Sequence, residues 1–284
     1  MKDFKNKVLV ITGAGSGIGA ALAREGVKRG MKVVLNDIDP KGLENTAKEL
    51  RNLGGEFAVQ AADISIYENV QSLLKLTLDT FGQVDMLCNN AGVTTGASIW
   101  EVPVQDIRWV NEVNLLSHLY GMNVFIPQMI KQGTEAVVVN TESAAGVMIS
   151  GTAVLYHATK HAGVAASEST SISLRQHGLD RIHVHCLVPS FIKTTIHLSD
   201  QHRPERYAVN EDPYYSSEPY KSGLRRSAKA VLAGTSVDYV GECVFSAVEE
   251  NRFYIFTHPE IIIPAGDRVM NMVNGKNPDS TYAL

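Results

Sequence analysis

Residues 8–19 read VLVITGAGSGIG, an apolar run followed by a loop with glycine at every second position. Val8–Thr12 is typical of a buried strand, and Ala20–Arg29 is expected to form the helix after the loop. Glycines in this setting let the backbone approach a pyrophosphate, and free N–H groups at the start of the helix bind phosphates. The loop therefore predicts a dinucleotide site with contacts from Gly13, Ser16, Gly17, Ile18 and Gly19.

Asp37 ends the next expected strand, Lys32–Asp37, about twenty residues beyond the loop, which is the spacing typical of dinucleotide sites. A carboxylate at this point accepts hydrogen bonds from the adenosine ribose and repels a 2′-phosphate, which predicts NAD rather than NADP as cofactor. The loop itself carries no Arg or Lys for that phosphate. The alternative is that Asp37 only caps a turn with Asp39 and Pro40.

Apolar strand-like segments alternate with helix-like segments along the rest of the chain. Further strands are expected at Phe57–Ala61, Val84–Cys88, Ala136–Thr141, Ile182–Val188 and Phe253–Thr257. Helices are expected at about residues 43–50, 70–81, 105–131, 153–177 and 237–250. This alternation predicts an α/β fold with a doubly wound parallel sheet, Rossmann-type, helices on both faces, and a single domain over residues 1–284.

Residues 190–228 are a polar segment without clear periodicity, rich in tyrosine and arginine. The segment follows the carboxyl end of an expected strand, where ligands bind in such sheets. A long irregular segment in a compact domain usually has a function, so we expect a substrate lid. The alternative is a surface excursion used in subunit contacts.

The composition excludes several classes of protein. The chain has 284 residues, 44% of them hydrophobic, and a net charge of −4 without a basic stripe, so nucleic acid is not an expected partner. It has neither the features of a signal peptide nor an apolar run of about 18 residues, so no membrane contact is expected and the cytoplasm is the expected location. Cys88, Cys186 and Cys243 form no C-x-x-C pair and are expected to be reduced thiols. His183 and His185 share a strand face but lack further ligands, so no metal is expected.

Polar residues follow two more of the expected strands at their carboxyl ends. Asp63 and Ile64 come after the third strand, and Asn89-Asn90-Ala91-Gly92 ends the fourth. Each group is compatible with simple turn chemistry. Because parallel strands end at one edge of the sheet, the two groups together predict further cofactor contacts from Asp63, Ile64, Asn90, Ala91 and Gly92.

Tyr156 and Lys160 lie four residues apart on an expected helix and share one face. A phenol ordinarily has a pKa of about 10, and a nearby ammonium favours the phenolate. A tyrosine with such a neighbour can exchange a proton with an alcohol or a ketone oxygen, and the lysine is also placed to hold the cofactor ribose. Alone, this pair arises often by chance.

Two further residues strengthen this prediction. Ser143 follows the fifth strand, where its hydroxyl is expected to bind the substrate oxygen. Asn114 lies inside an apolar helical segment and is expected to hold a water on a proton path to Lys160. In isolation, Asn114 would be read as an exposed polar position.

The motifs stand in one order: Thr12-Gly13-x-x-x-Gly17-x-Gly19, Asp63, Asn89-Asn90-Ala91-Gly92, Asn114, Ser143 and Tyr156-x-x-x-Lys160. In this order and spacing the chain resembles the short-chain dehydrogenase/reductase family from about Lys7 to Thr195. The resemblance implies a single-domain Rossmann fold and a homo-oligomer, a tetramer or a dimer. It also implies a catalytic tetrad of Asn114, Ser143, Tyr156 and Lys160.

The chain departs from the family pattern at two positions. Pro189-Ser190-Phe191-Ile192-Lys193-Thr194 stands where the family usually has Pro-Gly-x-x-x-Thr, so the resemblance implies cofactor contacts from Pro189, Ile192 and Thr194 while Ser190 replaces a glycine. Glu142 stands directly before Ser143, where the family more often has serine.

The sequence thus predicts an NAD(H)-dependent oxidoreductase that interconverts a secondary alcohol and a ketone, with Tyr156 as acid/base. Residues 144–149 and 93–98 are mostly apolar, so an apolar, aromatic or alicyclic substrate is expected, with aromatic residues available from the lid. Arg203, Arg206, Arg225 and Arg226 are available for an anionic group. The alternatives are an NADPH-dependent ketone or 3-oxoacyl reductase, which Asp37 disfavours, and a non-catalytic nucleotide-sensing protein, which the Tyr156–Lys160 pair disfavours.

Overall fold

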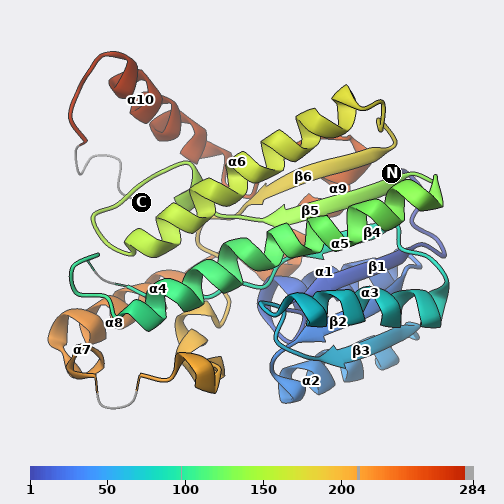
Figure 1. Cartoon of the computed structure of the whole chain (residues 1–284), viewed down its shortest axis with the longest axis horizontal. Coiled ribbons are helices and arrows are strands. Elements are labelled where there is room, and N and C mark those ends of the chain that lie inside the picture. Colours follow the sequence, from blue (N-terminus) through green and yellow to red (C-terminus); the bar gives the residue numbers. More distant parts are fainter. Residues whose placement is uncertain (97, 210–211, 279–284) are drawn as a thin grey trace.

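The computed structural model describes residues 1–96, 98–209 and 212–278, and within them a seven-stranded parallel sheet forms the centre (Figure 1). The strand order is β3-β2-β1-β4-β5-β6-β7. The strands are β1 (Val8–Thr12), β2 (Lys32–Asp37), β3 (Phe57–Ala61), β4 (Met86–Asn89), β5 (Ala136–Thr141), β6 (Ile182–Val188) and β7 (Tyr254–Phe256). This arrangement confirms the expected doubly wound, Rossmann-type α/β fold.

The central strands explain why the apolar runs were good predictors. Every residue of β1, β4 and β5 is buried, because helices cover the sheet on both sides. The strand order reverses between β1 and β4, and in such sheets the carboxyl ends at that point form a crevice for ligands.

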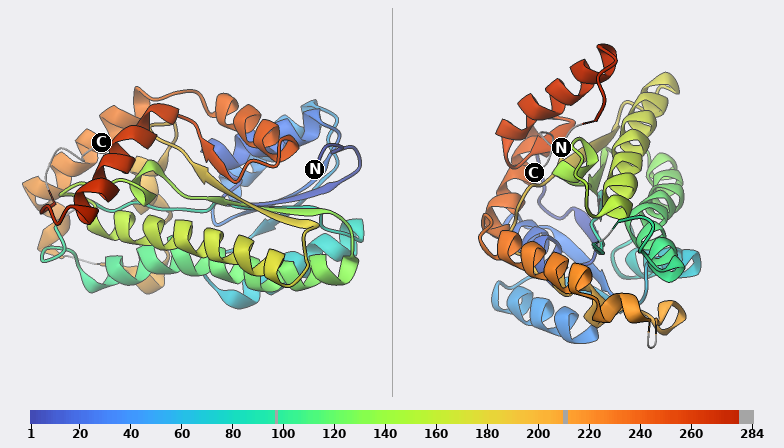
Figure 2. Two further views of the ribbon diagram at one scale, coloured as in Figure 1. Left: turned by 90° about the horizontal axis from the view of Figure 1, so that it is seen from above. Right: turned by 90° about the vertical axis from the view of Figure 1, so that its left-hand side faces the viewer.

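Helices cover the two faces of the sheet in separate layers (Figure 2). On one face Leu9 and Ile11 of β1 pack against α1 (Gly17–Lys28), α2 (Pro40–Asn52) and α9 (Val237–Glu249). On the other face Val8 and Val10 belong to a second hydrophobic cluster with residues of α3 (Tyr67–Phe81), α5 (Ser117–Gln132) and α6 (Val154–Gln176). Alternate side chains of one strand thus contribute to the two hydrophobic cores on opposite faces of the sheet.

The long helix expected at residues 105–131 is present but not regular throughout. It begins as α4 (Val104–Asn111), passes through a π-helical turn at Glu112–Leu116, and continues as α5. A π-turn inside an α-helix is uncommon and is found mostly at functional positions. Asn114 lies in this turn.

Three α-helices of the described structure were not predicted. The 190–228 segment contains α7 (Pro213–Ser216) and most of α8 (Glu218–Leu232), which lie beyond the carboxyl ends of the strands in Figure 1; Asn210 and Glu211 are outside the described residues. The Ser217 hydroxyl caps α8 by accepting from the Tyr220 N–H, so the start signal was in the sequence. Past the last strand, α10 (Ile262–Val273) projects from the body of the protein with exposed apolar side chains.

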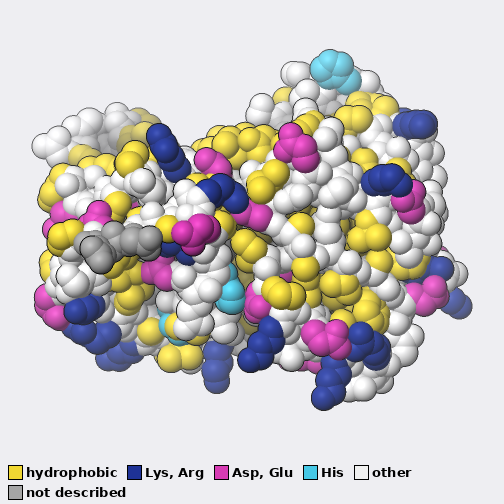
Figure 3. Space-filling view, turned by 60° about the horizontal axis from the view of Figure 1, so that its bottom comes forward, with side chains coloured by type: hydrophobic (Ala, Val, Ile, Leu, Met, Phe, Trp, Pro, Cys, Tyr) yellow, Lys and Arg dark blue, Asp and Glu magenta, His cyan; other side chains and the backbone are white. Residues whose placement is uncertain are grey.

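The structure also bears on the expectations about membrane-spanning segments, cysteines and histidines. Within the described parts of the chain, no helix is both long and apolar enough to cross a membrane. Cys88, Cys186 and Cys243 are free thiols. His185 is fully buried whereas His183 is half-exposed, and no set of three metal-binding side chains is found among the described residues. Basic and acidic side chains are interspersed on the face shown in Figure 3.

Candidate active site

The glycine loop between β1 and α1 approaches neighbouring backbone more closely than a side chain would permit. Gly13 has φ +65°, and a Cβ there would lie 2.8 Å from the Cα of Ala91. A Cβ on Gly19 would lie 2.1 Å from the carbonyl oxygen of Gly13. Gly13, Ser16, Gly17 and Ile18 line a cleft of about 1610 Å³, whereas Gly19 packs beneath the loop and does not line it. Gly19 is therefore a spacer in this structure.

Asp37 lies at the end of β2 and lines the same cleft. Its Oδ2 accepts from the Gly15 N–H at 2.8 Å and its Oδ1 from the Asp39 N–H at 2.9 Å. Burial raises the pKa of the Asp37 carboxyl, and these two hydrogen bonds oppose the rise. The turn contact with Asp39 is thus real, but each carboxylate oxygen keeps a lone pair for a ligand. Lys41 lines the cleft beside Asp37, and the sequence reasoning missed it.

The ends of β1 and β4 are tied together by hydrogen bonds. The Thr12 hydroxyl accepts from the N–H groups of Asn90 at 2.9 Å and Ala91 at 3.1 Å. The Asn90 side chain donates to the carbonyl oxygens of Thr12 at 3.0 Å and Gly13 at 3.2 Å. Asn90, Ala91 and Gly92 all line the cleft, as predicted. The Asn90 side chain shapes the loop because its amide is already engaged with the backbone.

Asp63 connects the sheet to the 190–228 segment. Its Oδ1 accepts from the N–H and the hydroxyl of Ser65, at 3.0 and 2.6 Å. Its Oδ2 pairs with Arg206 at 2.7 Å. Asp63 and Ile64 line the cleft, so this ion pair places the 190–228 segment across one end of it. Arg206 is engaged with Asp63, which argues against the role in substrate binding that the sequence left open.

The other arginines of the 190–228 segment differ in their surroundings. Arg203 is buried with Asp106 at 2.7 Å, and Arg225 pairs with Glu218 on the surface. Arg226 is the one that lines the cleft, and its recorded hydrogen bond is to a neighbouring hydroxyl of α8. Of the arginines considered from the sequence, only Arg226 faces the cleft without a paired carboxylate in the described structure.

The tyrosines of the 190–228 segment form a cluster rather than a pocket wall. The rings of Tyr214, Tyr215 and Tyr220 lie 5.0–5.1 Å apart. The Tyr215 hydroxyl donates to the buried Asp106, and burial raises the pKa of all three phenols. They anchor the segment. Of the aromatic residues described in the segment, Phe191 lines the cleft, and it is the one available to a substrate there.

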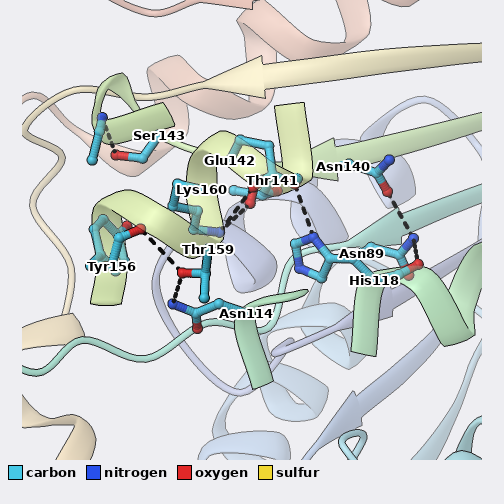
Figure 4. A network of polar contacts seen from close by, with 12 residues as sticks. Asn89, Asn114, His118, Asn140, Thr141, Glu142, Ser143, Tyr156, Thr159 and Lys160 are labelled. Atoms are coloured by element: carbon cyan, nitrogen blue, oxygen red, sulfur yellow. Dashed lines mark hydrogen bonds and ion pairs between the residues drawn. The ribbon is translucent and has the colours of Figure 1, made fainter. Parts of the chain in front are cut away.

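Ser143, Tyr156 and Lys160 line the same cleft as the glycine loop. Figure 4 shows these three side chains near one another. The Ser143 Oγ accepts from the Ala145 N–H at 3.1 Å. The Lys160 Nζ donates to the Thr141 carbonyl oxygen at 2.7 Å and lies 5.9 Å from the centre of the Tyr156 ring. The carboxyl end of β5 and the first turns of α6 thus bring a hydroxyl, a phenol and an ammonium to one place.

Asn114 is fully buried, so the reading as an exposed position is wrong. Its Oδ1 accepts from the Val93 N–H at 2.8 Å, and its Nδ2 donates to the Val93 carbonyl oxygen at 2.9 Å and to the Thr159 hydroxyl at 3.4 Å. Asn114 does not line the cleft itself. It joins the chain directly after Gly92 to the helix that carries Tyr156 and Lys160.

The stretch after β6 also faces the cleft. Pro189, Ser190, Ile192 and Thr194 all line it. Among the described non-glycine residues only Asn6, Ala153 and Asn251 have positive φ, so position 190 needs no glycine. Serine in place of the family's glycine therefore introduces no backbone strain.

The substrate side of the cleft is largely apolar. It is lined by Val93, Trp109, Val113, Leu198, Leu224 and Val231. His157 also lines the cleft, with its ring hydrogen-bonded to Ser150 at 2.9 Å. Residue 97 of the expected 93–98 wall is outside the described residues.

Glu142 was unexplained by the sequence, and the structure gives it a place. Its side chain is completely buried between His118, at 3.1 Å, and Lys160, at 3.6 Å. Figure 4 shows Lys160 between Tyr156 on one side and the Glu142–His118 pair on the other. His118 is a functional candidate that sequence reasoning missed, because only the fold brings it to Lys160.

Sequence comparisons agree with this arrangement. The family model for short chain dehydrogenase matches residues 7–205. The chain is 38% identical over 279 residues to the CLA biosynthesis dehydrogenase/reductase of Lactiplantibacillus plantarum, covering 98% of this chain and 97% of that protein. It is 30% identical over 269 residues to the 1-deoxy-11-beta-hydroxypentalenate dehydrogenase of Streptomyces exfoliatus, covering 93% and 88% of the two.

A solved structure gives the same answer for the whole fold. The short chain dehydrogenase/reductase from Burkholderia phymatum, in complex with NAD, is 36% identical, with a TM-score of 0.96 and full coverage of both chains. The glycine cradle, which has no room for side chains, and Asp37 fit a dinucleotide. The chain therefore belongs to the short-chain dehydrogenase/reductase family, and it is an oxidoreductase that acts on hydroxyl groups with a nicotinamide cofactor.

Proposed function

We propose that this protein is an NAD(H)-dependent oxidoreductase that interconverts a secondary alcohol and a ketone, with Tyr156 as the acid/base. The observation that carries the proposal is the position of Tyr156, Ser143 and Lys160 on the same cleft as the glycine loop and Asp37. Proton exchange and dinucleotide binding are thereby combined in one space.

The residues that would hold the cofactor follow the edge of the sheet. The N–H groups of the glycine loop and α1 suit the pyrophosphate, and Asp37 suits the adenosine ribose. The remaining contacts are assigned to Asp63, Ile64, Asn90, Ala91, Gly92, Lys160, Pro189, Ile192 and Thr194. When bound, the nicotinamide takes up or supplies the hydride.

The proton steps are assigned to the chain's own side chains. Because the Ser143 Oγ accepts from Ala145, its O–H is free to donate to the substrate oxygen. Tyr156 takes the hydroxyl proton during oxidation and returns it during reduction. The Lys160 ammonium lies 5.9 Å from the centre of the Tyr156 ring, where its positive charge faces that phenol. Asn114 holds the Gly92–Val93 chain against the helix of Tyr156; the water on a path to Lys160 stays a prediction.

The substrate is proposed to be apolar, alicyclic or aromatic, with residues 190–228 as its lid. The apolar side of the cleft supports this, as does the name of the Streptomyces exfoliatus relative, whose substrate is a hydroxylated compound. The ion pair between Arg206 and Asp63 supports a lid that closes over one end of the cleft. The expected homo-oligomer is tested by light scattering.

The preference for NAD has one competing observation. Lys41 lines the cleft close to Asp37 and would favour a 2′-phosphate, as in an NADPH-dependent reductase. The negative charge of Asp37 opposes that phosphate directly. Comparing kcat/KM for NADH and NADPH with one ketone decides between them, and a preference for NADPH would refute the assignment.

Tyr156→Phe tests the chemistry. Turnover on a panel of secondary alcohols with NAD⁺ is expected to fall about 10²- to 10⁴-fold, the range for a lost general acid/base. NADH binding, followed by fluorescence, is expected to persist. Tyr239→Phe, on an exposed part of α9, is the matched control. Near-normal turnover by Tyr156→Phe would contradict the proposal, and NADH binding without turnover by the unmodified protein would favour a nucleotide sensor.

A further inference from the structure

We propose that Glu142, paired with His118, is a positioning residue for Lys160, and that this buried pair sets the pH range in which Tyr156 exchanges its proton. The inference rests on the proposed function, because it assigns a role to Lys160. Glu142 lines the cleft together with Ser143, but its side-chain carboxylate is fully buried and faces His118 and Lys160, so we infer that it acts through Lys160.

Three ionisable side chains share a dry environment at this point. The side chains of Glu142, His118 and Lys160 are 0%, 2% and 3% exposed. Isolated charges are strongly unfavourable in such an environment, so they occur there only as pairs. The backbone N–H of Glu142 donates to the Leu187 carbonyl oxygen at 2.7 Å, which fixes the residue to the sheet.

The hydrogen bonds of His118 determine where its protons lie. The Nε2 atom is 3.1 Å from the carbonyl oxygen of Ala91, which can only accept, so Nε2 carries a proton. The Nδ1 atom is 3.1 Å from Glu142 Oε1. The Lys160 ammonium faces the other carboxylate oxygen and favours the ionised form of Glu142. The proton of the Glu142–His118 bond therefore belongs on Nδ1, which makes His118 an imidazolium.

The Lys160 ammonium has three N–H donors. One donates to the Thr141 carbonyl oxygen at 2.7 Å, and one faces Glu142 Oε2 at 3.6 Å. That oxygen has no hydrogen-bond partner among the described residues, so its attraction acts on Lys160 alone. The third donor is left for the cleft. Two fixed partners thus orient the ammonium before any ligand arrives.

Gly163 shows that the helix is shaped around this carboxylate. A Cβ at position 163 would lie 2.3 Å from the carboxyl carbon of Glu142. The glycine comes three residues after Lys160, on the same helix. His118 extends the pair to Ala91, and a Cβ on Gly92 would lie 3.9 Å from the Lys160 Nζ. The pair therefore connects the ammonium to the loop assigned to the cofactor.

The titratable groups around Glu142 come from three elements. Helix α6 contributes Lys160, α5 contributes His118, and β6 contributes Cys186. Burial raises the pKa of the Cys186 thiol, so it stays neutral. Of these three neighbours, Lys160 and His118 are therefore the ones whose charge can act on the Glu142 carboxylate.

The first test measures the pH dependence of oxidation in two variants. Glu142→Gln removes the negative charge, which favours loss of a proton from every neighbouring acid, so the profile of kcat/KM is expected to move to lower pH. His118→Asn removes a positive charge and is expected to move it to higher pH. At the optimum of the unmodified enzyme, each variant is expected to lose about 10- to 100-fold in kcat, the range for a hydrogen bond to a charged group. Loss of activity without opposite shifts would reduce Glu142 to a structural role and overturn the proposal.

A second measurement is independent of turnover. In the protein without cofactor, ¹⁵N NMR of the histidine ring is expected to show His118 protonated on both nitrogens near pH 7, and a neutral ring there would overturn the proposal. Glu142→Asp, which keeps the charge, is expected to keep the pH profile near its original position. If the imidazolium is found but no alcohol is turned over, the proposed function fails and the buried pair stands.

The packing argument has its own control. Gly163→Ala is expected to lower the melting temperature, because the new Cβ meets the Glu142 carboxylate. The double variant Glu142→Ser, Gly163→Ala is expected to lose less than the sum of the two single changes, because the carboxylate that meets the new Cβ is gone. Additive effects of the two changes would contradict the fit between these residues.

Discussion

The cleft has two halves that are built in different ways. The nucleotide half comprises residues 12–19, Asp37 and Asp63. Backbone groups form most of its surface, and several positions have no room for a side chain. In the reaction half, which comprises Asn114, the ends of β5 and α6, and the pair behind them, buried ionisable side chains dominate.

The difference reflects what each half has to recognise. A pyrophosphate has the same shape in every cofactor molecule, so a rigid backbone cradle serves it. Proton exchange needs a group whose charge can change, and the surroundings of that group must be set by other charges. The nucleotide half is therefore sensitive to volume, and the reaction half is sensitive to charge.

Gly19→Ala probes the volume sensitivity and should have the largest effect. The new Cβ would lie 2.1 Å from the Gly13 carbonyl oxygen, so the loop has to move. We expect the free energy of unfolding to fall by about 1–3 kcal/mol and kcat/KM for the cofactor to fall about 10²-fold or more. Gly266→Ala on α10, where the new Cβ has no neighbour within 4 Å, is the control, and equal effects of both changes would break the comparison.

His185 tests charge sensitivity in the sheet outside the two halves of the cleft, because it is buried in β6 without a carboxylate partner and does not line the cleft. Burial lowers its pKa from 6.5 to about 4, so the unfolded chain binds the proton more readily than the folded one. Stability is therefore expected to fall by about 3 kcal/mol as the pH decreases from 6.5 towards 4. Urea unfolding between these pH values measures it. His185→Gln should flatten this dependence while His177→Gln, on the surface, leaves it in place.

Asp37→Asn tests the carboxylate that ends β2. The substitution removes the charge that we propose to bind the ribose and to repel a 2′-phosphate. We expect kcat/KM with NADH to fall about 10- to 100-fold and NADPH to gain in relative terms. Adding Lys41→Ala should reverse part of that gain. An unchanged ratio of kcat/KM for NADH and NADPH would show that Asp37 only stabilises the turn with Asp39.

Arg206→Ala should have the smallest effect, because the pair with Asp63 is partly exposed. The two side chains are 37% and 13% exposed, so the change in stability is expected to be below about 1 kcal/mol. A modest rise in the KM of the cofactor would support a closing role for the 190–228 segment. Arg225→Ala, which breaks a surface pair of the same segment, is the control.

Much of this organisation was readable in the sequence for a physical reason. Parallel strands that are covered on both faces have continuous apolar sequences, so Val8–Thr12 and Ala136–Thr141 predicted the sheet. Tyr156 and Lys160 are neighbours on one helix turn, so their spacing alone brought them together.

The parts that were missed depend on long-range contacts or lack a core. Helix α10 buries none of its residues, so its apolar side chains did not mark a face that packs against the core. Helix α8 follows polar chain, where its capping serine was a weak signal. His118 and Glu142 are 24 positions apart, and only the packed structure reveals that they meet.

The π-turn at Glu112–Leu116 has a consequence for how this chain can vary in length. It holds one residue more than an α-helical turn, so the helix before it and the helix after it are rotated by about 100° relative to a continuous helix. Trp109, before the turn, lines the cleft, and Phe125, after it, packs in the core on one face of the sheet. A deletion of one residue here would give a smoother helix but would turn one of these two side chains away from its neighbours, so this helix tolerates substitution more readily than a change in its number of residues.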